Sequence, residues 1–119
     1  MKLREIIENL KLDVKTGRDN LDKEVTGGYV SDLLSDVMAN TRDGNIWITL
    51  QIHQNIVAVA LLKNLSAIVL VNSRVPENET IQKAKAENIP ILVSDLPAFE
   101  VVGRLHKMGI SGVVDVGGI

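Results

Sequence analysis

The chain of 119 residues contains no cysteine, which excludes disulfides, thiolate metal sites and cysteine nucleophiles together. It has no excess of positive charge, since its formal net charge is -2 and no basic field is available to hold a phosphate backbone. Its longest apolar run, residues 56–62, is too short to cross a bilayer, and charges interrupt the apolar positions of residues 1–8, where a signal peptide needs an unbroken apolar segment. We therefore expect a cytoplasmic protein that binds neither nucleic acid nor membranes.

The motifs of common catalytic sites are missing as well. The chain has no G-x-G-x-x-G, no G-x-x-x-x-G-K-[ST], no G-x-S-x-G and no H-E-x-x-H. No nucleophile, base and orienting group can be named together. We therefore predict that the protein is not an enzyme and that it has no metal site and no cofactor.

The composition is that of an ordinary folded protein, with 45% hydrophobic and 24% charged residues. Its length is typical of one domain, so residues 1–119 are predicted to form a single domain.

Hydrophobic periodicity predicts alternating helices and strands. A spacing of three and four residues predicts helices over residues 3–10, 30–38, 55–65 and 79–87, and from near Asp95 to Gly109. Alternation or short apolar runs predict strands over residues 12–15, 46–50, 67–71 and 89–93. The tail, residues 111–119, is either an edge strand or loosely ordered. This order predicts an α/β fold with an open, mostly parallel twisted sheet and helices on both faces.

The helix predicted over residues 55–65 is apolar around most of its circumference. Its apolar residues are Ile56, Val57, Val59, Leu61, Leu62 and Leu65. A helix that is apolar all round must be covered on both sides, and symmetric dimers are the commonest assemblies. We therefore predict a homodimer that uses this helix.

Three polar loops follow predicted strands, and ligands of open parallel sheets bind beyond the carboxyl ends of the strands. The loops are residues 51–55, 72–74 and 94–95. His53 could exchange a proton or contact a phosphate, although a lone histidine is also typical of a polar loop or a helix cap. Arg74 could hold an anion, but an exposed arginine after a strand is usually solvated.

Other polar residues favour structural interpretations. Asp95 is interpreted as a helix cap, and His106 as a complement to the dipole of the last helix. Asp32 and Asp36 stand four residues apart on a predicted helix, where two isolated acids normally interact with solvent rather than with a cation.

The sequence Thr26-Gly27-Gly28 is predicted to be a turn before a helix. Paired glycines in that position can expose backbone N–H groups to an anion, or they can simply turn the chain tightly. The complete set of candidate ligand-binding residues is Thr26, Gly27, Gly28, Gln51, His53, Gln54, Asn55, Asn72 and Ser73.

The segment Glu24-Val25-Thr26-Gly27-Gly28, with residues 29–38 and 47–60, resembles the DRTGG domain family. Glu24 and Val25 stand where the motif has an acid and an arginine. The resemblance implies a fold like the N-terminal domain of HPr kinase/phosphorylase, with relatives inside phosphotransacetylases and between the CBS domains of some pyrophosphatases. It also implies a bacterial, often dimeric accessory module, with catalysis left to other domains.

Two functions follow as hypotheses. The first is a regulatory module that binds a small anionic or nucleotide-like ligand in the crevice formed by the polar loops. The second is a scaffold that binds another protein and no small ligand.

Overall fold

The computed structural model describes residues 1–113, in which five strands form one sheet with the order β1-β5-β4-β3-β2. The strands are β1 (Asp13–Thr16), β2 (Gly27–Val30), β3 (Asn45–Thr49), β4 (Ala67–Leu70) and β5 (Ile91–Val93). Strands β2 to β5 are parallel to their neighbours, and only β1 pairs antiparallel, with β5. The prediction of an open, mostly parallel sheet is therefore confirmed.

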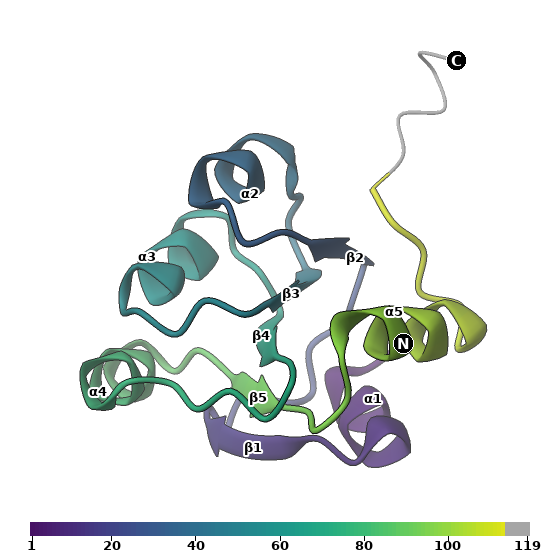
Figure 1. The fold of residues 1–119 in the computed structure, drawn as a ribbon, viewed down its shortest axis with the longest axis horizontal. Coiled ribbons are helices and arrows are strands. Elements are labelled where there is room, and N and C mark those ends of the chain that lie inside the picture. Colours follow the sequence, from purple (N-terminus) through teal and green to yellow (C-terminus); the bar gives the residue numbers. More distant parts are fainter. Residues whose placement is uncertain (114–119) are drawn as a thin grey trace.

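Helices cover both faces of the sheet, as predicted (Figure 1). They are α1 (Leu3–Leu10), α2 (Leu34–Asn40), α3 (Asn55–Leu62), α4 (Asn78–Glu87) and α5 (Ala98–Lys107). The helices α2, α3 and α4 lie on one face, whereas α1 and α5 lie on the other. Each of the three crossovers on the first face joins one parallel strand to its immediate neighbour.

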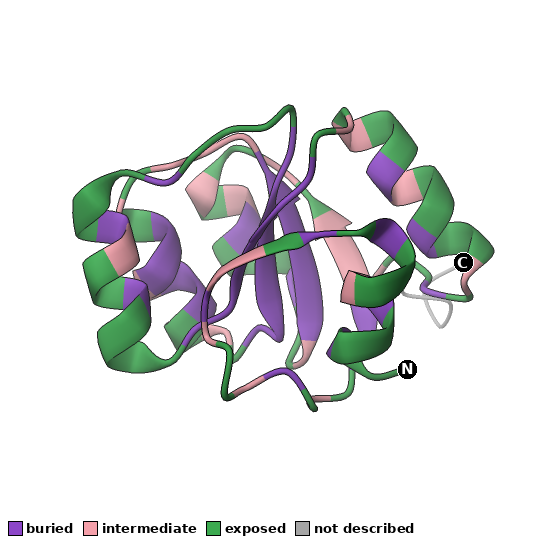
Figure 2. Ribbon diagram, turned by 90° about the horizontal axis from the view of Figure 1, so that it is seen from below, coloured by how far each residue is buried: buried purple, intermediate pink, exposed green. Residues whose placement is uncertain are grey.

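The core is divided by the sheet into two apolar layers. In β3, Ile46 and Ile48 face α1 and α5, whereas Trp47 faces α2 and α3. All five residues of β3 and all four of β4 are buried (Figure 2). A strand covered on both faces is mostly apolar, which is why residues 67–71 are all apolar and residues 46–50 are apolar except for Thr49.

The segment containing the two glycines is a strand and not a turn. Gly27 and Gly28 begin β2, where they pair in parallel with Asn45 and Ile46 of β3. The predicted helix over residues 30–38 therefore starts later, at Leu34. Glycine has little intrinsic preference for a strand, so the pairing with β3 decides the conformation of this segment.

The last helix also begins later than predicted. Its first residue is Ala98, preceded by Pro97, and Asp95 does not cap it. The Asp95 carboxylate instead accepts a hydrogen bond from the Ser73 hydroxyl at 2.8 Å. The interpretation of Asp95 as a helix cap was therefore wrong.

Most of the apolar surface of α3 is covered by the chain itself. Helix α3 packs between α2 and α4 and against β4, and it buries Ile56, Val57 and Val59. The helix ends at Leu62, three residues earlier than predicted. Only Leu61 and Leu62 remain exposed on it as large apolar side chains, at 48% and 72%.

Residues 110–113 pass along the outer edge of β2. Gly112 forms an isolated parallel bridge with Gly28, and the Gly28 N–H donates to the Ser111 carbonyl at 2.9 Å. The remaining six residues of the tail, for which the sequence left two alternatives open, lie outside the described residues. Within the described part of the chain, no helix is long and apolar enough to span a membrane.

Candidate functional site

Because β2, β3, β4 and β5 are parallel, their carboxyl ends lie side by side at the same end of the sheet (Figure 1). The loops that follow them contain most of the candidate ligand-binding residues. Within residues 1–113, however, the crossovers from β2 to β5 all proceed in one direction, so no reversal of strand order opens a crevice. Ligands of open parallel sheets bind where the strand order reverses, so the topology of this sheet gives less support to a ligand site at the carboxyl ends of the strands.

Asp32 connects the loops that follow β2 and β3. Its carboxylate accepts hydrogen bonds from the Thr49 hydroxyl at 2.8 Å and from the Leu50 N–H at 2.7 Å. The Gln51 side-chain amide donates to the Asp32 carbonyl at 2.9 Å. Both Gln51 and Asp32 thus hold the two strand ends together, so the amide of Gln51 is already engaged.

A second set of bonds joins the loops after β4 and β5. The Ser73 N–H donates to the Ser94 carbonyl at 2.8 Å, and the Asn72 N–H donates to the Leu96 carbonyl at 2.9 Å. Asn72 and Ser73 both have positive φ angles, 55° and 57°, which non-glycine residues seldom adopt. Both side chains are exposed at the sheet edge.

The loop of residues 51–55 lies between these two sets. His53 is exposed, and its Nδ1 accepts the N–H of Asn55 at 3.2 Å, which supports the start of α3. The Gln54 side chain donates to Glu79 of α4 at 3.4 Å. The N-cap residue of α3 is Gln54, so His53 supports the start of the helix from the position before the cap. Its Nε2 and the exposed side chain of Asn55 are the groups that remain available to a ligand.

Thr26 and Gly27 lie at the opposite end of the parallel strands, where β2 begins. The Thr26 hydroxyl donates to the Asp43 carbonyl at 2.7 Å and accepts a hydrogen bond from the Asn45 amide at 3.1 Å. A Cβ atom on Gly27 would lie 3.0 Å from the Ser111 carbonyl oxygen. The structure therefore separates the candidate residues into two groups, and it gives the glycine segment contacts within the chain.

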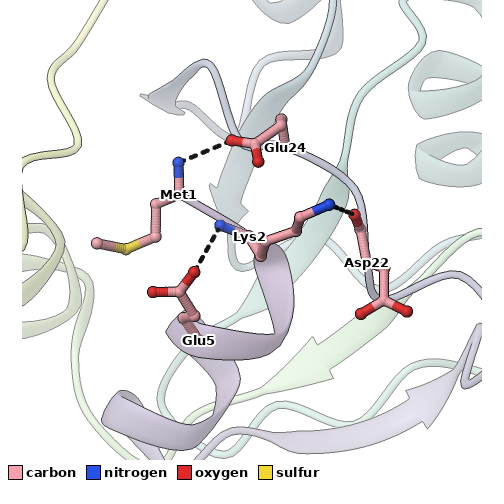
Figure 3. A network of polar contacts seen from close by, with 5 residues as sticks. All are labelled: Met1, Lys2, Glu5, Asp22 and Glu24. Carbon is pink, nitrogen blue, oxygen red and sulfur yellow. Dashed lines mark hydrogen bonds and ion pairs between the residues drawn. The ribbon is translucent and has the colours of Figure 1, made fainter.

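The two residues that depart from the family motif also have contacts within the chain. The Glu24 carboxylate lies 2.8 Å from the Met1 amino group (Figure 3). The Val25 N–H donates to the Met1 carbonyl at 2.9 Å. The hydrogen bond and the charge of that amino group lower the pKa of Glu24. Nearby, the Lys2 ammonium donates to the Asp22 carbonyl at 2.9 Å.

Asp36 accepts hydrogen bonds from two side chains that the sequence did not single out. The Tyr29 hydroxyl and the Asn40 amide both lie 2.8 Å from its Oδ1 atom. The hydroxyl groups of Ser31 and Tyr29 and the amide of Asn40 lower the pKa of Asp36, and its carboxylate raises the pKa of Tyr29. The carboxylates of Asp32 and Asp36 therefore accept hydrogen bonds from different groups. Within the described residues, no group of three histidine or acidic side chains could hold a metal ion.

The sequence also did not predict an apolar groove of about 340 Å³ between β2 and α5, here called the β2–α5 groove. Val30 and Ile48 line it from the sheet, Val102, Leu105 and His106 line it from α5, and residues 110–113 border it. The groove forms because β2 is the edge strand on this side and α5 lies over its apolar face. Its lining residues come from segments far apart in the sequence, so no local sequence signal could have identified it.

Comparison with known proteins identifies relatives of this fold. The family model described as the DRTGG domain matches residues 5–108. No curated protein matches the chain significantly. The chain is similar to a solved structure of the CBS and DRTGG domains of the regulatory region of Clostridium perfringens pyrophosphatase, complexed with the activator diadenosine tetraphosphate. The TM-score is 0.65 at 18% sequence identity, and the match covers 85% of this chain and 44% of that chain. At this identity the likeness shows a shared fold.

Proposed function

The chain belongs to the DRTGG domain family, and from that premise we propose that it is a noncatalytic regulatory module that binds a small anionic or nucleotide-like ligand as a homodimer. The observation that carries the proposal is the row of polar groups at the carboxyl edge of the sheet. His53 and Asn55 follow β3 there, and Asn72 and Ser73 follow β4, the next strand in the sheet. All four side chains are exposed.

The class of ligand is supported by the relative in which the same fold occurs. The regulatory region of the pyrophosphatase was solved with a nucleotide activator, and that region contains CBS domains as well as a DRTGG domain. Since this chain spans only 44% of that chain, the relative supports the class of ligand and not its position. A cytoplasmic location agrees with this proposal and with the lack of cysteine.

A screen against nucleotides and phosphorylated metabolites by thermal shift, followed by calorimetry, tests the proposal. We expect at least one ligand to bind, and we expect Asn55→Ala to weaken it because the exposed amide lies among the candidate groups. Gln82→Ala on the exposed side of α4 is the matched control, since it also removes an exposed helical amide. The absence of any binder would contradict a ligand-binding function.

The homodimer is supported by the two leucines that end α3. Leu62 is 72% exposed and Leu61 is 48% exposed, whereas the rest of the large apolar side chains on this helix are buried within the chain. We expect Leu62→Glu to shift the mass measured by sedimentation from dimer to monomer, because a second copy would have to bury the new charge. A monomeric wild-type chain at micromolar concentration would contradict the dimer.

The same exposed leucines also favour the second candidate function, a scaffold that binds another protein. Capture of a stable partner by the wild-type chain and by a His53→Ala/Asn55→Ala variant alike would support the scaffold. Loss of the partner in Leu62→Glu would place the contact on α3.

A further inference from the structure

We propose that the β2–α5 groove binds a flat nitrogen heterocycle of the nucleobase type, whose edge pairs with the backbone of Val30. This inference rests on the proposed function, because it names the class of ring that such a ligand carries. Three features of the groove support it: the open edge of β2, the apolar walls and the number of backbone groups available there.

Val30 lines the β2–α5 groove, and its backbone N–H and C=O lie on the side of β2 that faces away from β3. Residues of a strand direct their N–H and C=O groups to alternate sides. The Gly28 N–H points outward to the Ser111 carbonyl at 2.9 Å, and the Ser31 N–H points inward to the Ile48 carbonyl. The backbone N–H and C=O of Val30, two residues after Gly28, therefore also point away from β3. Within residues 1–113, neither of these groups has a hydrogen-bond partner.

The walls of the groove are suited to a ring. Ile48 lines the groove and is almost fully buried, whereas Val30 is 47% exposed and Val102 of α5 is half-buried. The volume of about 340 Å³ lies at the small end of the range of roughly 300–1,000 Å³ that is typical of small-molecule pockets. Such pockets combine apolar walls with a few polar groups, which Val30 and the rim residue His106 supply here.

The number of outward backbone groups favours a ring over an added strand. Strand β2 has four residues, and only Gly28 and Val30 point outward. Since the N–H of Gly28 is already bonded, one residue is left with both a donor and an acceptor. Main-chain hydrogen bonds provide the affinity of an added strand, and a single pair is too few for it. One pair is sufficient for a ring such as adenine, which presents an acceptor nitrogen beside an amino donor.

Titration of the full chain with adenosine, followed by amide NMR, tests the inference. We expect the amides of Val30 and Val102 to shift. We expect purine riboside, which lacks the amino group, to bind at least about ten-fold more weakly, because the Val30 carbonyl is then left unpaired. A Val30 amide that is already protected from solvent exchange before adenosine is added would overturn the inference, since another occupant would hold the edge.

Two pairs of variants locate the site. Val30→Pro removes the N–H at a position whose N–H faces away from β3, where proline is tolerated, whereas Val30→Ala keeps the N–H. We expect Val30→Pro to bind adenosine at least about ten-fold more weakly than Val30→Ala. Val102→Trp fills the groove and should abolish binding, whereas Gln82→Trp on the opposite face of the sheet should not. Thermal unfolding verifies that each variant is folded.

The outcomes separate this inference from the proposed function. Failure of adenosine to bind at millimolar concentration, or equal affinity of the two Val30 variants, would overturn the groove site. If a phosphorylated ligand still binds, and only Asn55→Ala weakens it, the regulatory module stands and the β2–α5 groove is not its site.

Discussion

The two glycines of β2 are predicted to tolerate alanine very differently. A Cβ atom on Gly27 would lie 3.0 Å from the Ser111 carbonyl oxygen and 3.3 Å from Nδ2 of Asn45. Neither neighbour moves easily, because the Ser111 oxygen accepts the Gly28 N–H and the buried Asn45 amide donates to Thr26. We expect Gly27→Ala to lower the free energy of unfolding by about 1–3 kcal/mol, through crowding and the strained Ser111 hydrogen bond.

Gly28→Ala is the matched comparison. Its Cβ atom would meet Ile110 at 3.6 Å and Ile46 at 3.7 Å, which are ordinary van der Waals distances. The loss of backbone freedom in the unfolded chain should offset any remaining cost, so we expect a change within about 0.5 kcal/mol of zero. Urea denaturation of both variants, followed by circular dichroism, measures the difference directly.

The same pair of variants has a local readout. If alanine at position 27 displaces residues 110–112, the amide of residue 28 should be less protected from solvent exchange in Gly27→Ala than in Gly28→Ala, where its partner Ser111 stays in place. Equal free energies of unfolding for the two variants would refute the argument that the first glycine is required by the close approach of the Ser111 carbonyl.

Three further predictions concern single contacts. Thr16→Val should cost about 2–4 kcal/mol by urea denaturation, because the buried hydroxyl donates to the Ile89 carbonyl and accepts the Ile91 N–H; a cost below 1 kcal/mol would contradict this. Trp47→Phe should cost about 2–3 kcal/mol, because the fully buried indole N–H donates to the Ser31 carbonyl at 2.8 Å; an unchanged denaturation midpoint would be inconsistent with this. Tyr29→Phe removes a donor that lowers the pKa of Asp36, so a carbon NMR titration should show that pKa rising toward its usual value. The lowered pKa of Asp36 stabilises the fold at pH values above its unfolded-state pKa, and this stabilisation is lost as the pH falls through its folded-state pKa. Because Tyr29→Phe raises the folded-state pKa, acid unfolding should begin at a higher pH in this variant.

The layered architecture could be predicted from the sequence because apolar periodicity is a local signal. Residues 46–50, which are nearly all apolar, indicated an interior strand, and residues 67–71 indicated another strand; both β3 and β4 are buried along their whole length. The spacing of Leu3, Ile6 and Leu10 indicated a helix with one buried face, and all three are buried in α1.

The candidate site could be predicted from the sequence only in part. The sequence grouped Thr26 and Gly27 with the loops after β3 and β4, but the two residues lie at the amino end of β2, at the opposite edge of the sheet. His53 could be identified as a residue near a helix start, yet the atom that it uses there, Nδ1, depends on the fold of the loop. The β2–α5 groove joins residues some seventy positions apart in sequence, so no local pattern indicates it.

The sequence by itself determined the alternation of helices and strands other than β2, the fold class and the resemblance to the DRTGG family, because these depend on patterns within short segments. Only the tertiary structure decided that the Gly27-Gly28 pair is the start of a strand, that α3 is covered mostly by its own chain, and that residues 110–112 approach the edge of β2. The physical reason is that glycine and exposed polar residues have weak local preferences. Their conformation and contacts are therefore set by distant segments that pack and form hydrogen bonds with them.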